Sequence, residues 1–217
     1  FQKLPWNNIK NNINFYNNYL IQATLSNIYD FHIFYSGISN IRTYNKYFYN
    51  LYDKTFVFDL EGNILLKKDF ILTEHIYNTI YKGYFHIRKG QIFNGNGYII
   101  TIKNWENFMG IFSFDEDNLT NDTEILLYPK IINLKVVLDN SFLGTKGGGI
   151  IQPFSRFFKI QDCMFDSFNN SKGTSIIGEN SGGIAGASIG YNYGRVVIQN
   201  CITIGDIIGD YSGGICG

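Results

Sequence analysis

Acidic side chains gather in one polar stretch of this chain. It contains Asp115, Glu116, Asp117, Asp122 and Glu124. Two carboxyl groups about 5–10 Å apart across a cleft hydrolyse glycosidic bonds, and carboxylate oxygens are ligands that calcium prefers. The stretch lacks the spacing and the central glycine of an EF-hand loop, and adjacent acidic residues on a polar loop usually form a solvated face. We therefore predict a projecting loop without catalytic or metal-binding residues, and keep hydrolysis and calcium binding as alternatives.

Three further polar residues occupy matching places in similar phrases of the sequence: Asp139, Asp162 and Asn200. Stacked Asn and Asp side chains can hydrogen-bond to one another and to the turn backbone. This pattern predicts a structural ladder, with an acidic line along one face of the molecule as the alternative. Asp206 and Asp210, which an Ile-Ile-Gly segment separates, are predicted to be corner residues.

Nucleophiles and metal ligands are sparse. The histidines show no HExxH or other metal-binding spacing, and none lies near a Ser or Cys in a nucleophile motif; they are His32, His75 and His86. The cysteines form neither a disulfide framework nor a metal-spaced group; they are Cys163, Cys201 and Cys216. Strands stacked about 4.8 Å apart would bring Cys163 and Cys201 together. We expect two small buried thiols, with a disulfide as the alternative.

Aromatic and glycine-rich segments suggest binding rather than catalysis. A sugar-stacking or protein-contact surface could use Trp105, Tyr191, Tyr193 and Tyr211. The glycine runs at 147–149 and 182–183 do not match a phosphate-binding loop, since the motif GxxxxGK[ST] is absent and no helix is expected to follow. No cofactor is expected.

The composition limits the classes of partner and fold. The chain has 217 residues, with 18 Lys and Arg balanced by 18 Asp and Glu. This balance argues against nucleic acid as a partner, and the lack of about 18 consecutive apolar residues argues against a membrane span. Abundant Ile, Tyr and Phe favour strands, whereas Gly and Asn favour tight turns. These proportions are typical of an all-β protein.

Strand-sized apolar segments separated by Gly and Asn turns would position the candidate residues. We predict strands at Phe56–Leu60, Ile64–Leu66, Phe70–Leu72, Phe85–Ile87, Gln91–Phe93, Tyr98–Ile102 and Met109–Phe114. The later part repeats itself: KIQDC (159–163) and SGGIAG (181–186) recur as VIQNC (197–201) and SGGICG (212–217). A weaker copy is VVLDN (136–140) followed by GGGII (147–151). Repeats with a period of roughly 20–50 residues are typical of stacked architectures.

These observations predict an all-β fold, a right-handed parallel β-helix (solenoid). Residues 1–54 would form an irregular, β-rich N-terminal cap. Residues 55–217 would form the β-helix, with atypical first coils at 55–134 and regular repeats at 135–217. Because the sequence ends inside a repeat phrase, we expect the fold to be truncated at its C-terminus.

The phrases also resemble a known family. NGNGYIITI (94–102), followed by MGIF (109–112) and the two SGGI copies, is similar to GLUG-type repeat proteins. The resemblance covers about residues 93–217 and implies a right-handed parallel β-helix of the pectin-lyase type. Bacterial members are often secreted or surface adhesins. The Asn-rich and Ile-rich character also resembles uncharacterised repeat proteins of giant amoeba-infecting viruses.

The resemblance and the missing catalytic signature predict a non-catalytic structural or surface protein, adhesin-like or virion-associated. A carbohydrate-binding module and a polysaccharide lyase or glycoside hydrolase of the pectin-lyase-like type are the alternatives. Expected partners are a glycan or a cell-surface protein, and a homo-oligomer is the expected assembly. An extracellular, cell-surface or virion location would fit this role.

Overall fold

A computed structural model describes residues 55–58, 63–79, 85, 87, 89–114, 128–168, 170, 175–176, 178–191 and 194–217. The predicted cap at 1–54 and the acidic stretch at 115–124 lie outside the described residues.

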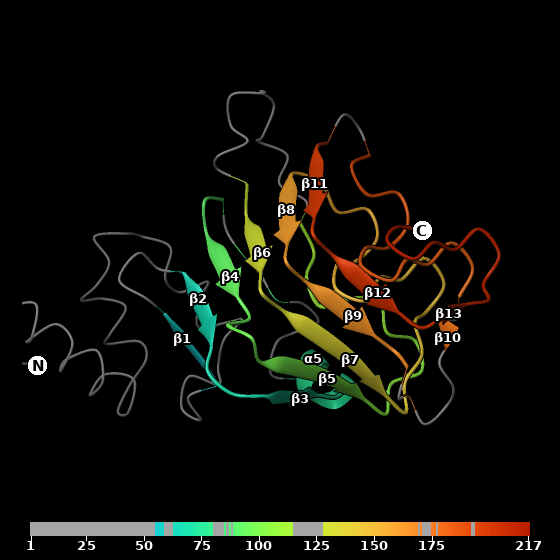
Figure 1. The fold of residues 1–217 in the computed structure, drawn as a ribbon, viewed down its shortest axis with the longest axis horizontal. Coiled ribbons are helices and arrows are strands. Elements are labelled where there is room, and N and C mark those ends of the chain that lie inside the picture. The colour runs from blue at the N-terminus through green and yellow to red at the C-terminus, as the bar shows by residue number, and fades with distance from the viewer. Residues whose placement is uncertain are drawn as a thin grey trace, which may run out of the picture.

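Most of the regular structure consists of short strands in two main sheets (Figure 1). The six-stranded sheet contains, in spatial order, β1 (Phe56–Phe58), β2 (Ile64–Leu66), β4 (Ile92–Asn94), β6 (Lys130–Ile132), β8 (Phe158–Gln161) and β11 (Val196–Gln199). The five-stranded sheet contains β3 (Phe70–Leu72), β5 (Ile99–Lys103), β7 (Lys135–Asp139), β9 (Met164–Asp166) and β12 (Ile202–Ile204). A two-stranded sheet pairs β10 (Ser175–Ile176) with β13 (Asp206–Ile207). The short helix α5 (Glu74–Thr79) follows β3.

The chain passes from the six-stranded to the five-stranded sheet in each layer, and successive layers pair in parallel. The segment 158–161 lies in register with 196–199, and 164–166 lies in register with 202–204. The predicted match between the KIQDC and VIQNC phrases is thus confirmed. Alternate residues point inward, as Val136 and Leu138 do on β7, because successive side chains of a strand face opposite sides of the sheet.

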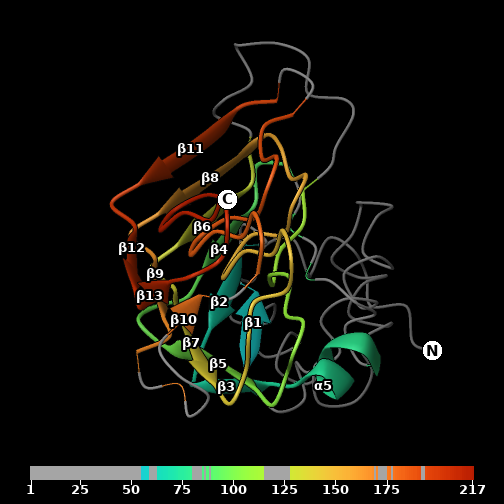
Figure 2. The same ribbon diagram turned by 90° about the vertical axis from the view of Figure 1, so that its right-hand side faces the viewer.

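The side of the core away from the two sheets has no regular strands among the described residues (Figure 2). It is held by isolated parallel bridges that join Gly148 to Gly182 and Gly182 to Gly213. A second line of bridges joins Phe85, Phe112, Ile151, Ala185 and Cys216 in turn. The glycine-rich phrases therefore stack on one another, as the repeat predicts. We call this part of the molecule the bridged side.

The core is one continuous cluster of aliphatic and aromatic side chains between the sheets and the bridged side. Phe93 and Phe112 meet edge to face with their ring centroids 4.8 Å apart, and Phe85 lies 5.8 Å from Phe112. Such aromatic pairs stabilise a core beyond the area that they bury. Strands and bridges are thus held together by the same apolar interior.

The predicted right-handed parallel β-helix is wrong as stated. The strands form separate sheets that do not close on each other, and β1 runs antiparallel to β2, so the six-stranded sheet is mixed. Glycine has a low strand propensity and carries no side chain to pack, and the glycine-rich phrases accordingly form single bridges instead of a third wall. The described fold is a mainly β arrangement of two main open sheets, a two-stranded sheet and one short helix.

Candidate functional site

A corner of the protein is built by asparagines that follow two neighbouring strands. Asn104 comes directly after β5 and Asn140 directly after β7, and these strands pair in register. Both residues have left-handed backbone angles, with φ of 55° and 51°, a conformation that Asn tolerates better than most residues. The Asn140 side-chain amide donates a hydrogen bond to the Asn104 carbonyl oxygen at 2.6 Å. The Asn104 and Asn140 side chains are therefore stacked at the carboxyl ends of two neighbouring strands of the five-stranded sheet.

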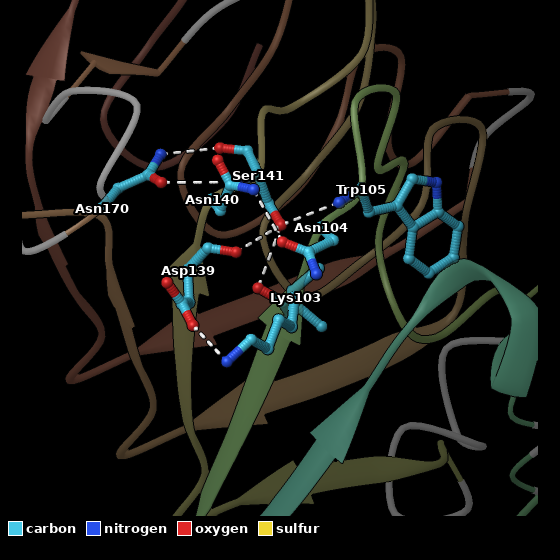
Figure 3. A network of polar contacts seen from close by, with 8 residues as sticks. Lys103, Asn104, Trp105, Asp139, Asn140, Ser141 and Asn170 are labelled. Carbon is cyan, nitrogen blue, oxygen red and sulfur yellow. Dashed lines mark hydrogen bonds and ion pairs between the residues drawn. The ribbon is translucent and has the colours of Figure 1, made fainter.

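Hydrogen bonds between buried polar groups hold this corner in place (Figure 3). The Trp105 amide donates to Ser141 Oγ at 3.1 Å, and Ser141 Oγ lies 3.0 Å from the carbonyl oxygen of Ile102. Asn170 closes the next layer: its Nδ2 donates to the Ser141 carbonyl oxygen at 2.6 Å, and its Oδ1 accepts from the Ser141 amide at 3.2 Å. Buried polar groups that are paired in this way make a rigid and specific unit.

Helix α5 is anchored against the same corner. The Tyr77 ring lies 5.2 Å from the Trp105 ring, and its hydroxyl donates to the Ile111 carbonyl oxygen at 2.9 Å. Gln152 Nε2 donates to the Tyr77 hydroxyl at 2.6 Å. Burial raises the pKa of Tyr77, so its phenol stays protonated and remains a donor. The anchor holds Glu74, the first residue of α5, beside the corner.

Together these elements leave a polar recess, an open pocket of about 440 Å³ lined by Glu74, Asn104, Glu106, Asn107 and Asn140. All its lining side chains are carboxylates or carboxamides. Carboxamides both donate and accept hydrogen bonds, whereas ionised carboxylates only accept. A sugar hydroxyl is also both donor and acceptor, so the recess offers complementary groups for a polyhydroxylated ligand.

The Lys103–Asp139 ion pair flanks the stacked asparagines. Lys103 Nζ lies 3.1 Å from Asp139 Oδ2, and the two side chains are 44% and 38% exposed. Exposed ion pairs of this kind contribute little to stability. Asp139 does not line the recess, and it lies at the end of β7 opposite Lys103 of β5.

The predicted ladder of Asp139, Asp162 and Asn200 is correct for only two of its members. Asn200 Nδ2 donates to Asp162 Oδ1 at 3.1 Å. The residue that precedes Asp162 in this stack is Asn133, because Ile132 pairs with Gln161. Asp139 belongs to the other corner, at the end of β7. The similarity between VVLDN and KIQDC thus aligned two different corners of the same layer.

The cysteines Cys163 and Cys201 follow this ladder and are free thiols. Cys163 is buried and Cys201 is half-buried. A hydrogen bond from the Cys163 thiol lowers the pKa of Cys201 to about 7, while burial and the nearby Asp162 act in the opposite direction. Burial raises the pKa of Cys216. The alternative of a disulfide between Cys163 and Cys201 is not realised in the structure.

The predicted aromatic surface is dispersed. Trp105 is only 7% exposed and packs inside the corner, whereas Tyr211 is 82% exposed. Tyr191 is half-buried and contacts Arg156. Tyr193 lies outside the described residues.

The other predicted positions contribute nothing to the recess. His75 is exposed on α5. Asp206 is exposed on strand β13, so its prediction as a corner residue is wrong, whereas Asp210 is exposed in a turn near the C-terminus. His32 and His86 lie outside the described part of the chain. Across the residues that the structure describes, no three His, Cys, Asp or Glu side chains group so that they could hold a metal ion.

None of the five residues that line the recess was predicted as a site residue; they are Glu74, Asn104, Glu106, Asn107 and Asn140. Glu106 and Asn107 closely follow Asn104 in the polar phrase Asn-Trp-Glu-Asn, which is a weak signal of a functional turn. Glu74 carries no such signal, because it reaches the site only through the packing of Tyr77 on Trp105.

Comparisons with protein-family models, curated proteins and solved structures give no match for this chain. Among the described helices none is long and apolar enough to cross a membrane.

Proposed function

We propose that this chain is a non-catalytic, adhesin-like structural protein that binds a neutral glycan in the polar recess. The recess itself carries the proposal, since its walls combine three carboxamides and two carboxylates in a pocket of about 440 Å³. The size suits one or two sugar units, because small-molecule pockets span roughly 300–1,000 Å³. The surrounding hydrogen bonds support binding further, since they fix the corner before a ligand arrives.

A second candidate is glycoside hydrolysis, which the two carboxylates Glu74 and Glu106 favour. Such enzymes use one carboxyl group as a general acid and the other as a nucleophile or base. Both side chains line the same pocket. This candidate keeps the same ligand class and differs only in the fate of the glycosidic bond.

Calorimetric titration with a panel of neutral oligosaccharides tests the first candidate. We expect at least one to bind. Glu74→Gln should weaken its binding about tenfold, since one hydrogen bond to a charged group contributes about 1.5–3 kcal/mol, and Asn107→Ala should weaken it roughly threefold to tenfold, since a neutral hydrogen bond contributes about 0.5–1.5 kcal/mol. Glu179→Gln is the matched control, because it removes an exposed carboxylate that does not line the recess. If no sugar binds, or if the control weakens binding equally, the proposal is wrong.

The same samples separate binding from hydrolysis. Release of reducing ends that Glu74→Gln or Glu106→Gln abolishes would establish the second candidate. Binding without such release supports the first.

A further inference from the structure

Five side chains near the bridged side form a continuous contact chain, which we call the cation–aromatic cluster: Lys146, Phe154, Arg156, Phe157 and Tyr191. The Arg156 guanidinium carbon lies 5.1 Å from the Tyr191 ring centroid and 5.6 Å from that of Phe157. Phe154 meets Tyr191 edge to face at 6.0 Å, and Lys146 Nζ lies 5.9 Å from the Phe154 ring. Two cations are thus interleaved with three rings.

The backbone of the cluster is held in unusual conformations. Lys146, Phe154 and Phe157 have φ of 67°, 60° and 58°, in the left-handed region. Large side chains rarely adopt this region. Main-chain bonds impose it here: the Lys146 amide donates to the Glu179 carbonyl oxygen at 2.8 Å, and the Phe154 amide donates to that of Ala187 at 3.0 Å. Backbone strain of this kind concentrates at ligand-binding positions.

More positive charge lies along the adjoining sheet. Lys159 of β8 follows Arg156 by three residues and pairs in register with Lys130 of β6. Partial burial and the charge of Lys130 lower the pKa of Lys159. Like charges directly opposite each other destabilise a sheet, so a bound anion would relieve this repulsion. Arg195, immediately before β11, adds an exposed cation.

We propose that the cation–aromatic cluster binds an acidic sugar unit, one that carries a sulfate or carboxylate group. A guanidinium presents a planar set of donors that matches these anions in two-point contacts, and stacking on two rings fixes the Arg156 side chain. Phe154, whose side chain is 47% exposed, offers an apolar ring for the C–H face of the sugar. Lys146 supplies a second charge beside that ring.

Two features favour a glycan over a nucleic acid. Lys and Arg are balanced by Asp and Glu, 18 of each, whereas nucleic-acid-binding domains usually carry a large basic surface. The two cations of the cluster also match an isolated acidic unit better than a continuous phosphate backbone. The cluster shares no residue with the polar recess, so this inference goes beyond the proposed function and can succeed or fail independently of it.

Titration calorimetry with a sulfated heparin-type tetrasaccharide tests the inference. We expect binding that weakens when the salt is raised from about 50 to about 200 mM, because salt screens the charges. Arg156→Gln should weaken binding roughly tenfold or more. Lys67→Gln is the charge-matched control and should leave binding unchanged, since Lys67 is an exposed cation just beyond the C-terminal end of β2.

Phe154→Gly separates ligand contact from folding. Glycine adopts the left-handed region readily, so this variant should lose affinity and retain its melting temperature. If Arg156→Gln does not fold, Phe154→Gly and Lys146→Gln still test the site. The recess variants Glu74→Gln and Asn107→Ala should leave binding of the sulfated probe intact.

Several outcomes would overturn the inference. The inference is wrong if the tetrasaccharide does not bind, or if neutral maltotetraose binds as tightly as the tetrasaccharide. It is also wrong if Lys67→Gln loses as much affinity as Arg156→Gln, or if single-stranded oligothymidylate binds more tightly than the tetrasaccharide. Binding of inorganic sulfate as tight as that of the tetrasaccharide would mean that the cluster is a simple anion site, and would also overturn the inference.

The acidic stretch 115–124 provides one more test. We expect the tetrasaccharide to bind while Asp115, Glu116 and Asp117 keep their charges. If it binds only after these three residues are replaced with their amides, the cluster is an ion-pair partner of the acidic stretch and the inference is wrong.

Discussion

Single residues at the corners carry much of the information in this fold. Asn133, Asp162 and Asn200 have φ between 51° and 54° and stand at equivalent turns of successive layers. Asn and Asp adopt this left-handed conformation several times more often than other non-glycine residues. Asn and Asp at these described corners therefore have a direct structural cause, and the amino-acid sequence by itself indicates such turns.

The Cys163–Cys201 pair leads to a prediction about thiol reactivity. The pKa of Cys201 is lowered from 9.0 to about 7, and a lowered pKa means that the thiolate forms at lower pH. Because the thiolate is the nucleophile, alkylation of Cys201 by iodoacetamide should reach half of its maximal rate near pH 7. Mass spectrometry of the labelled peptides across pH 5–10 measures this profile.

The Cys163 thiol makes the largest contribution to the lowering of the Cys201 pKa, so Cys163→Ala should move the midpoint for Cys201 upward. Cys216→Ala should leave it in place, since the Cys216 thiol does not contribute to the pKa shift of Cys201. An unchanged profile in the Cys163 variant would contradict the assigned cause.

The meeting of the recess residues could not be predicted from the sequence. Glu74 and Glu106 have no spacing that predicts their meeting, because Glu74 depends on the tertiary contact between Tyr77 and Trp105. Conversely, Trp105 was a candidate for a sugar-stacking surface and is buried behind the recess. Whether an aromatic side chain faces solvent or the core depends on packing that local sequence does not encode.

At the scale of elements, apolar segments between turn residues predict several of the strands. The expected strands at Ile64–Leu66 and Phe70–Leu72 match β2 and β3, and Tyr98–Ile102 differs from β5 by one residue at each end. Within the expected strands at Phe85–Ile87 and Met109–Phe114, the described residues form only single bridges, at Phe85 and Phe112. Apolar character is retained there, but the ladder is not continuous.

Helix α5 was not predicted, although one signal for it exists. Thr73 precedes the helix, and its Oγ1 accepts a hydrogen bond from the Ile76 amide at 3.3 Å, as an N-cap side chain does. A helix of six residues has too few periodic positions to be recognised from the sequence. Its stability comes instead from the buried Tyr77.

The stacked glycine phrases give a prediction for the bridged side. A Cβ on Gly183 would collide with the Gly214 carbonyl oxygen and the Thr203 side chain. Gly183→Val should therefore destabilise the protein by about 1–3 kcal/mol, as overpacking does, and lower the melting temperature by several degrees. Thermal unfolding followed by circular dichroism measures the change.

Gly214 is the matched control because it occupies the equivalent place in the next copy. A Cβ there would meet only Ile207 Cδ1 at 3.6 Å, an ordinary contact. Gly214→Ala should therefore melt close to the wild type, and Gly183→Ala clearly below it. Equal effects at the two positions would mean that stacking is not what excludes the side chain.

For the whole molecule, the repeats predict which segments stack but not how the sheets end. The register of the copies is as expected. The antiparallel pairing of β1 with β2 could not be read from any repeat, because β1 lies before the repeated part. Closure could not be predicted either, since it depends on whether glycine-rich segments form full ladders.

The layer that contains β12 and β13 exposes apolar side chains. Ile202 is 52% and Ile208 is 63% exposed, and in the described structure β12 has a strand partner only on the β9 side. Exposed apolar edges favour association between molecules. We therefore expect concentration-dependent self-association, and we expect Ile202→Lys with Ile208→Lys to suppress it in sedimentation-velocity experiments.

Ile71→Lys serves as the control for this effect. Ile71 is 53% exposed but lies on β3, at the opposite edge of the five-stranded sheet. Its substitution should leave association unchanged. Wild-type protein that stays monomeric at every concentration would contradict the prediction.

The in-register parallel layers also have a mechanical consequence. Tension applied perpendicular to the strands, along the direction in which layers succeed one another, loads the hydrogen bonds of one layer at a time. Tension applied along the strands loads every ladder of both sheets in shear at once. The molecule should therefore unfold layer by layer at low force in the first geometry and resist unfolding in the second. The direction in which a tethered partner pulls would then set the lifetime of the attachment.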